Sequence, residues 1–161
     1  MDIKYLQILV DNPRIKVPDA EAWWTNEPLD MQEIEALEVT YNGGLTFPTS
    51  LRELLYVAGG SCYVLDYAGF GSQNILQQKA RSCLTMYGRN FSITRPYFVI
   101  DVYNYGDQFL FVYLDEGGSD PMVYQALLDE DEDPWITSLG RTLSRYIEST
   151  TRTLLMGYNP F

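Results

Sequence analysis

Apolar residues recur every three to four positions in four stretches of the sequence, which predicts four helices. These stretches are 30–42, 48–58, 72–88 and 137–154. Asp30 and Glu33 have the spacing of a capping box, and the last stretch has a long apolar face opposite charged residues, which is typical of an amphipathic C-terminal helix. Helical segments therefore occur both before and after the centre of the chain.

The second of these helices has clear signals at both ends. Pro48 precedes its apolar run, and Thr49 or Ser50 is expected to cap it, because a side-chain oxygen there satisfies a free backbone N–H. Gly59 and Gly60 follow the run, whereas a phosphate-binding loop needs its glycines before a helix. We interpret Gly59 as a left-handed residue that ends the helix.

Runs rich in β-branched and aromatic residues predict four strands. The runs are 61–67, 97–103, 108–114 and 122–127. The second and third flank Asn104 to Asp107, so they predict a β-hairpin. The expected fold class is α+β, one antiparallel sheet flanked by helices with an amphipathic helix at the C-terminus.

At 161 residues and 46% hydrophobic composition, the chain is expected to form one domain over 1–161. Residues 1–28 are expected to be an irregular lead-in that includes at most a short N-terminal helix. Trp23 and Trp24 in that stretch are expected to pin it to the core. The predicted core is Leu51, Leu54, Leu55, Val99, Phe109, Phe111, Val123, Leu143 and Ile147.

The net charge is −11, from 22 acidic and 11 basic residues. Between Arg95 and Arg141 there is no Lys or Arg, and ten carboxylates occur in that segment. Such a charge distribution repels nucleic acid and anionic membranes and attracts a cationic partner. A high charge also keeps a protein soluble, which is the simpler interpretation. No apolar run is long enough to span a bilayer and no secretory leader is evident, so we expect a cytoplasmic protein.

The sequence contains no histidine, which excludes catalytic groups built on His. Cys62 and Cys83 lack the spacing of a zinc site and are expected to be buried, reduced thiols. The run 129–133 lacks the spaced ligands and the glycine of a calcium loop, so a solvated loop is favoured over a metal site. We expect no enzyme activity, no cofactor and no metal; a carboxylate-based or metal-dependent hydrolase is the less favoured alternative.

The order of these motifs resembles the SUKH superfamily, which includes fungal cell-wall-assembly regulators and bacterial immunity proteins. The resemblance rests on "EIEALEVTYNGGLTFPTSLRELLYVAGG", with its Phe47-Pro48 pair, on "GDQFLFVYLDEGGSDPMVYQ" and on "SLGRTLSRYI". It covers the chain from about Trp24 to Ile147. This sequence has Leu143 where the family often has an aromatic residue.

The resemblance implies an immunity protein that neutralises a cognate secreted toxin domain, in many relatives a nuclease, by stoichiometric occlusion. A protein that is itself acidic suits a toxin whose active-site surface is basic. The alternative that the family also allows is a non-catalytic intracellular regulatory or scaffold protein. The residues do not indicate the oligomeric state.

The segment without Lys or Arg is the predicted partner-binding surface, because one aromatic anchor surrounded by carboxylates suits a cationic protein. The anchor is Tyr105 in the hairpin turn, next to Asp107. The densest charge is the loop 129–133, and two further acids are expected at the rim. The full predicted set is Tyr105, Asp107, Asp115, Glu116, Asp129, Glu130, Asp131, Glu132 and Asp133.

Overall fold

The computed structural model of the chain describes residues 1–16, 21–66, 68–89, 92–103, 106–129 and 134–158. The helices are α1 (Gln7–Asp11), α2 (Met31–Asn42), α3 (Thr49–Ala58), α4 (Gln73–Met86) and α5 (Leu143–Leu155), with a short 3-10 turn, η1 (Ala68–Phe70). The strands are β1 (Arg14–Lys16), β2 (Trp23–Thr25), β3 (Tyr97–Tyr103), β4 (Gln108–Tyr113), β5 (Met122–Leu127) and β6 (Ile136–Thr142).

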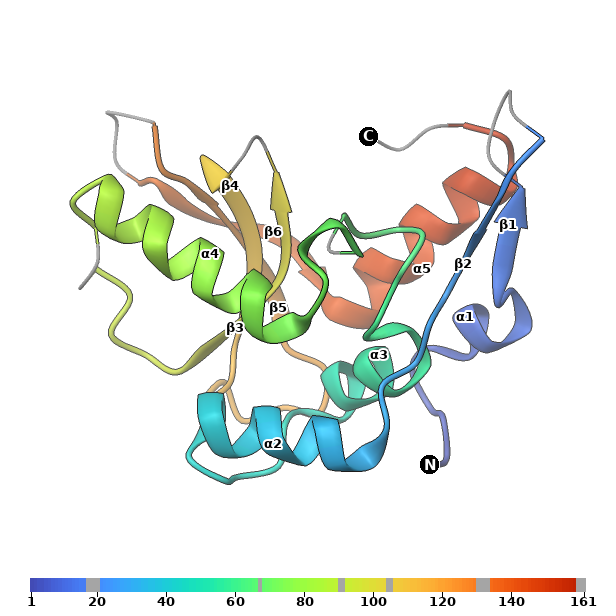
Figure 1. Cartoon of the computed structure of the whole chain (residues 1–161), viewed down its shortest axis with the longest axis horizontal. Coiled ribbons are helices and arrows are strands. Elements are labelled where there is room, and N and C mark those ends of the chain that lie inside the picture. Colours follow the sequence, from blue (N-terminus) through green and yellow to red (C-terminus); the bar gives the residue numbers. More distant parts are fainter. Residues whose placement is uncertain (17–20, 67, 90–91, 104–105, 130–133, 159–161) are drawn as a thin grey trace.

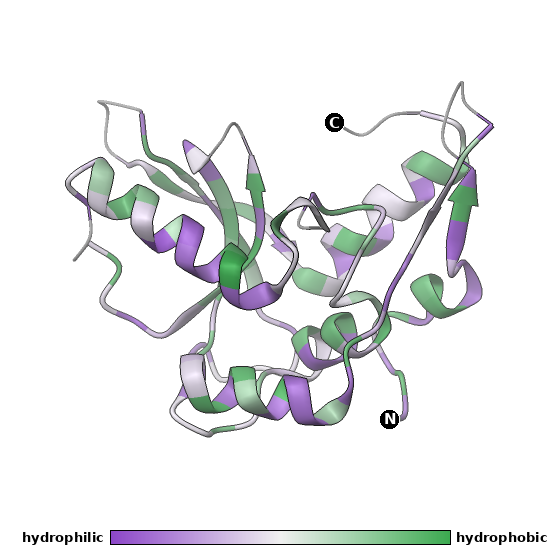
Figure 2. Ribbon diagram, viewed as in Figure 1, coloured by the Kyte–Doolittle hydropathy of each residue, from purple (hydrophilic) through white to green (hydrophobic). Residues whose placement is uncertain are grey.

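The main sheet is antiparallel, with strand order β3-β4-β5-β6, and α4 runs along β3 while α5 follows directly from β6 (Figure 1). β3 and β4 are buried over most of their length, as their nearly continuous apolar sequences require. Figure 2 shows this as hydrophobic colour along the central strands, while hydrophobic and hydrophilic bands are mixed along the helices. The protein is therefore an α+β fold with an antiparallel sheet, flanking helices and a C-terminal helix, as the hydrophobic pattern predicts.

The nine predicted core residues all lie in one buried cluster. The capping box is also confirmed, because the Asp30 side chain accepts a hydrogen bond from the Glu33 backbone and the Glu33 side chain accepts one from Asp30. Ser72 caps α4 through the Ile75 backbone N–H, and Cys62 and Cys83 are both buried thiols. Local pattern was sufficient wherever a segment's own residues make its stabilising contacts.

Gly59 differs from its predicted left-handed conformation. Its φ of −74° and ψ of −21° are ordinary helical values, so conformational freedom is not the reason for a glycine there. A Cβ atom at this position would lie 2.4 Å from the Leu55 carbonyl oxygen and 2.8 Å from Leu29 Cγ. Gly59 is required because the chain before α2 packs directly against the end of α3.

The cap predicted at Thr49 or Ser50 was also wrong. Pro48 occupies the N-cap position and no side chain caps the first turn of α3. The Ser50 backbone N–H instead donates to the carbonyl of Ser119, 2.9 Å away, so a distant loop satisfies it. Tertiary contact replaces the local cap here.

Two further boundaries were wrong. A strand is predicted over 61–67, but residues 61–66, the described part, do not form one: Ser61 makes a single bridge to Glu27, and the chain then turns, with Leu65 N–H donating to the Cys62 carbonyl. The C-terminal helix begins at Leu143 rather than Thr137, because residues 136–142 complete the sheet as β6. Asp120 binds the Ser144 backbone N–H and hydroxyl, at 2.9 and 2.6 Å, and so fixes the start of α5.

The lead-in is more ordered than predicted. It contains α1 and a two-stranded antiparallel ribbon, β1-β2, in which Ile15 pairs with Trp24 and Lys16 pairs with Trp23. Trp23 and Trp24 do not pin a loop to the core, because 55% and 41% of their surfaces are exposed. This ribbon carries the two exposed tryptophans to the edge of a cavity.

Candidate functional site: a cleft between the N-terminal ribbon and the sheet

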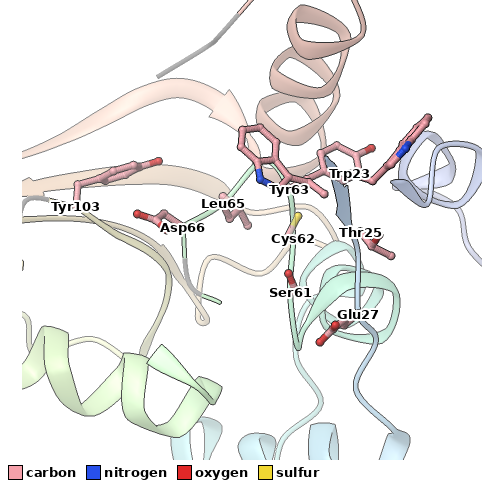
Figure 3. Close-up of a pocket in the computed structure, with 10 residues that line it drawn as sticks. Trp23, Thr25, Glu27, Ser61, Cys62, Tyr63, Leu65, Asp66 and Tyr103 are labelled. Atoms are coloured by element: carbon pink, nitrogen blue, oxygen red, sulfur yellow. The ribbon is translucent and has the colours of Figure 1, made fainter. Parts of the chain in front are cut away.

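A cavity of about 650 Å³ lies between the N-terminal ribbon, the turn after α3 and the end of β3. We call it the ribbon cleft. It is lined by Trp23, Trp24, Thr25, Glu27, Ser61, Cys62, Tyr63, Leu65, Asp66 and Tyr103. Figure 3 shows Asp66 and Tyr103 on one side, Trp23 and Thr25 on the other and Cys62 between them. Four aromatic side chains and two carboxylates therefore surround one cavity.

The two tryptophans have different environments because adjacent residues of a strand point to opposite faces. Trp24 lies opposite the buried Ile15, so its side chain shares the inner face of the ribbon. Trp23 is on the other face, where the Arg14 guanidinium carbon lies 4.8 Å from the centre of its ring. Both tryptophans line the cleft, but the Trp23 ring is already stacked against Arg14.

The backbone on both sides of the cleft is held by hydrogen bonds across distant parts of the sequence. Glu27 N–H donates to the Ser61 carbonyl at 2.8 Å, and Gly60 N–H donates to the Glu27 carbonyl at 2.8 Å. The Tyr63 hydroxyl donates to the Asn12 carbonyl at 2.9 Å, which joins the turn to the end of α1, just before the ribbon. The turn after α3 and the ribbon are therefore fixed relative to each other.

Asp101 holds the opposite wall. Its carboxylate is fully buried and accepts hydrogen bonds from the backbone N–H groups of Asp66 and Val102, both at 2.9 Å, and from the Tyr103 hydroxyl. A register shift between Val99 and Asp101 breaks the regular alternation of β3 at this point. Asp101 thereby fixes two residues that line the cleft.

Burial raises the pKa of Asp101 from its ordinary 3.8 to about 6, although these hydrogen bonds favour the charged form. Burial and the neighbouring Asp101 carboxylate raise the pKa of Tyr103, and burial raises the pKa of Tyr146. A shifted carboxyl beside a cavity is one mark of a catalytic site. Asp101 itself does not line the cleft, so its role there is to position Asp66 and Tyr103.

The cleft has a strongly unbalanced charge. Its two lining carboxylates, Glu27 and Asp66, are exposed, and neither forms an ion pair with any residue that the structure describes. No Lys or Arg is among the described residues that line the cavity. Aromatic surface next to unpaired carboxylates is suited to a cationic group. The described part of the chain contains no group of three or more Cys, Asp or Glu side chains placed to hold a metal ion.

The predicted partner-binding residues fall into two groups at opposite ends of the main sheet. Asp107 and Asp129 belong to the first group: Leu128 N–H donates to the Asp107 carbonyl at 2.7 Å, which brings the hairpin turn and the start of the acidic loop together. The Tyr87 hydroxyl donates to Asp107 at 2.6 Å, and this bond raises the pKa of Tyr87 to about 12. Tyr105, Glu130, Asp131, Glu132 and Asp133 lie outside the described residues.

Asp115 and Glu116 form the second group, in the turn after β4. The Arg95 guanidinium lies 2.6 Å from Asp115 and 3.9 Å from Glu116, and it stacks 3.9 Å from the centre of the Tyr113 ring. Arg95 lowers the pKa of Asp115 through its hydrogen bond and charge. Both carboxylates are therefore already paired with a cation of the chain, whose single charge offsets one of their two.

A second cavity, of about 600 Å³, has the opposite charge. Arg141, Arg145 and Arg152 line it together with one carboxylate, Glu148, which pairs with Arg152 at 2.7 Å. Arg141 donates to the Ser149 hydroxyl at 3.0 Å. The protein thus separates a basic groove on β6 and α5 from the acidic ribbon cleft.

Sequence reasoning missed the ribbon cleft. The available signal was the Trp23-Trp24 pair in a short polar stretch between Glu21 and Glu27. Two adjacent tryptophans on a strand necessarily point to opposite faces, so both cannot enter a single core. The cleft's other wall comes from residues 40 to 80 positions away, and no local pattern links them to the ribbon.

No family model, no curated protein and no solved structure matches this chain. Among the described residues, no helix has the length and apolar character needed to cross a membrane.

Proposed function

We propose that this protein is a SUKH-type immunity protein that binds a cationic toxin domain and neutralises it by occlusion, without chemistry of its own. The observation that carries the proposal is the ribbon cleft, where exposed tryptophan surface adjoins two carboxylates that no Lys or Arg of the lining neutralises. Binding energy at protein interfaces concentrates in such aromatic anchors, and tryptophan is the most frequent of them.

The net charge of −11 supports the same proposal in a different way. Long-range attraction between an acidic protein and a basic one accelerates association, while the close contacts of the anchor residues set how long the complex lasts. A toxin that acts on nucleic acid needs a basic surface to hold phosphates. The acidic protein covers that surface, so the substrate is excluded.

The arrangement of elements also supports the resemblance to SUKH proteins. The motif segments contain, in the expected order, α2, the Phe47-Pro48 pair, α3, β4, β5 and the start of α5. Pro48 stands at the N-cap of α3, and Phe47 is buried in the core. The residues that carry the resemblance therefore have structural roles in this chain.

The test begins with the genes that flank this one. A secreted toxin domain encoded there is expressed in a susceptible host alone, with this protein, and with its Trp24→Ala variant. We expect growth to be restored by the wild type and restored poorly by the variant. Calorimetry with the purified pair is expected to give one protein per toxin domain.

Two controls make the outcome decisive. Val39→Ala removes another exposed apolar side chain, on α2, and should protect as well as the wild type. An inactive toxin domain should still form the complex. Binding of the toxin without protection would favour the scaffold alternative, and the absence of any complex would overturn the proposal.

A further inference from the structure

The chain already shows how it holds a guanidinium group on its own surface. Arg95 stacks on Tyr113 at 3.9 Å while it forms an ion pair of 2.6 Å with Asp115, although more than 40% of each charged side chain is exposed. An aromatic face supplies stacking surface and an adjacent carboxylate supplies charge and paired hydrogen bonds. This pair of groups defines what an arginine site needs in this protein.

The ribbon cleft contains the same two groups without an arginine. Trp24 exposes 41% of its surface on the inner face of the ribbon, and the exposed carboxylates of Asp66 and Glu27 border the same cavity. The basic residues of the ribbon, Arg14 and Lys16, lie on the face that carries Trp23 and Thr25, and Arg14 stacks on the Trp23 ring. Among the described residues, no Lys or Arg lines the cavity itself. The guanidinium site is therefore built but not filled from within the described chain.

We propose that the ribbon cleft receives an arginine side chain of the partner, with its guanidinium group stacked on Trp24 and paired with Asp66. This inference rests on the proposed function only in assigning the arginine to a toxin domain. The cavity of about 650 Å³ lies within the usual range for ligand pockets, about 300–1,000 Å³, and has room for the side chain and adjoining backbone.

Arginine fits this site better than lysine for a physical reason. The guanidinium group is planar and weakly hydrated, so it stacks on an indole ring and donates two parallel hydrogen bonds to one carboxylate. An ammonium group is compact and strongly hydrated, and loses more on leaving water. The described residues make five cation–aromatic contacts with Tyr or Trp rings, and the cation is an arginine in each of them. One guanidinium, that of Arg81, contacts two rings, Tyr41 and Tyr97.

Asp66 is the favoured charge partner because its backbone is held while its carboxylate is exposed. Its N–H donates to the buried Asp101 carboxylate at 2.9 Å, and Asp101 also binds the hydroxyl of Tyr103. Figure 3 shows Asp66 beside Tyr103 at one side of the cleft. The negative charges of Asp66 and Glu27 both border the same cavity, so a neutral group there gains less than a cation.

The experiment uses small probes, so it does not require the toxin. N-acetyl-arginine N-methylamide is titrated into the ¹⁵N-labelled protein, and the three indole N–H signals of Trp23, Trp24 and Trp135 are followed by NMR. The matched probe is the corresponding citrulline derivative, which keeps the planar shape of arginine but carries no charge. Trp→Phe variants assign the signals.

We expect the Trp24 signal to shift saturably with the arginine probe, and the citrulline probe to bind at least about tenfold more weakly. Asp66→Asn should weaken arginine binding by about five- to tenfold, and the lysine analogue should bind more weakly than arginine. Asp115→Asn is the matched control, because that carboxylate already pairs with Arg95, and it should leave the titration unchanged.

Three results would overturn the inference: equal binding of arginine and citrulline, an Asp66→Asn variant that binds like the wild type, or no saturable shift of Trp24. A saturable shift at Trp135 instead would place the cation near the acidic segment that includes Asp129. The proposed function can fail separately from this inference. If the arginine probe binds the cleft but the protein protects against no flanking toxin, the arginine site stands and the immunity role is ruled out.

Discussion

The ribbon cleft and the turn after β4 both combine carboxylates with aromatic rings, but they differ in what neutralises the charge. In the turn, Arg95 pairs with Asp115 and Glu116 and stacks on Tyr113. In the cleft, Glu27 and Asp66 adjoin two tryptophans, and the lining provides no cation. Charge that is dense along a sequence is therefore not the same as charge that is available to a partner.

The largest effect on stability is expected at Glu53, which anchors the N-terminal segment that precedes the ribbon. Glu53 is fully buried in α3 and accepts hydrogen bonds from the backbone N–H groups of Lys4, Tyr5 and Leu6, at 2.8, 2.8 and 3.0 Å. Glu53→Ala leaves these donors unpaired and should lower the free energy of unfolding by about 3–5 kcal/mol, measured by urea denaturation.

Glu53→Gln keeps one carbonyl oxygen and should cost less than Glu53→Ala. Hydrogen exchange should also be faster in the N-terminal segment than in β3 and β4 of the variant, because the anchor serves that segment. Wild-type stability of Glu53→Ala would contradict the role of Glu53.

The second prediction separates Asp101 from Asp115 by pH. Because the pKa of Asp101 rises from 3.8 to about 6 on folding, the folded protein binds more protons than the unfolded chain between these pH values. The free energy of unfolding should therefore fall as the pH rises through this window, by on the order of 3 kcal/mol from this group. Denaturation of the wild type and of Asp101→Asn between pH 4 and 7 should show this loss in the wild type alone.

Asp115 should have the opposite sign, because Arg95 lowers its pKa. Its contribution to stability is present above its unfolded pKa and is lost as the pH falls through the folded value. Asp115→Asn should accordingly differ from the wild type least at the acid end. Parallel pH profiles for the wild type and Asp101→Asn would show that Asp101 is not buried as described.

The third prediction concerns the close contact between the end of α3 and the chain before α2. Gly59→Ala places a Cβ atom 2.4 Å from the Leu55 carbonyl oxygen and 2.8 Å from Leu29 Cγ, so it should lower the free energy of unfolding by about 1–3 kcal/mol. Gly60→Ala meets its nearest atom, the Glu27 carbonyl oxygen, at 3.2 Å and should be milder. Thermal denaturation of both variants gives the order, and a larger loss at Gly60 would reverse it.

The smallest effect on stability is expected from neutralising the acidic segment. Replacing all five acids of 129–133 by Asn or Gln should change stability by less than about 0.5 kcal/mol and slow association with the partner mainly at low salt. Asp66→Asn should instead raise the dissociation rate, because it removes a contact rather than a distant charge. Stopped-flow and surface-binding measurements at two salt concentrations separate these effects.

Tyr105→Ala sharpens the same comparison. If the hairpin turn is the anchor that the sequence predicts, this variant should raise the dissociation rate more than Trp24→Ala does. If the ribbon cleft is the anchor, Trp24→Ala should have the larger effect. Equal, wild-type dissociation of both variants would place the partner on neither surface.

The sequence by itself determined the elements whose signals are local. The capping box of Asp30 and Glu33, the hairpin of β3 and β4 and the one apolar core are all present as predicted. In each case, residues three to four apart on a helix, or two apart on a strand, already contain the packing surface or the hydrogen-bond partner. Neighbouring residues were enough to decide these structures.

Only the tertiary structure decided which carboxylates are available. Asp101, Asp115 and Glu116 belong to the same segment without Lys or Arg. In the structure, however, Asp101 is buried next to the ribbon cleft, and the other two are paired with Arg95. A Cβ atom at Gly59 likewise would meet Leu29, thirty positions earlier, in addition to the nearby Leu55 carbonyl oxygen. Coulomb energy and steric contact depend on separation in space, and the fold sets that separation by joining segments that no local period relates.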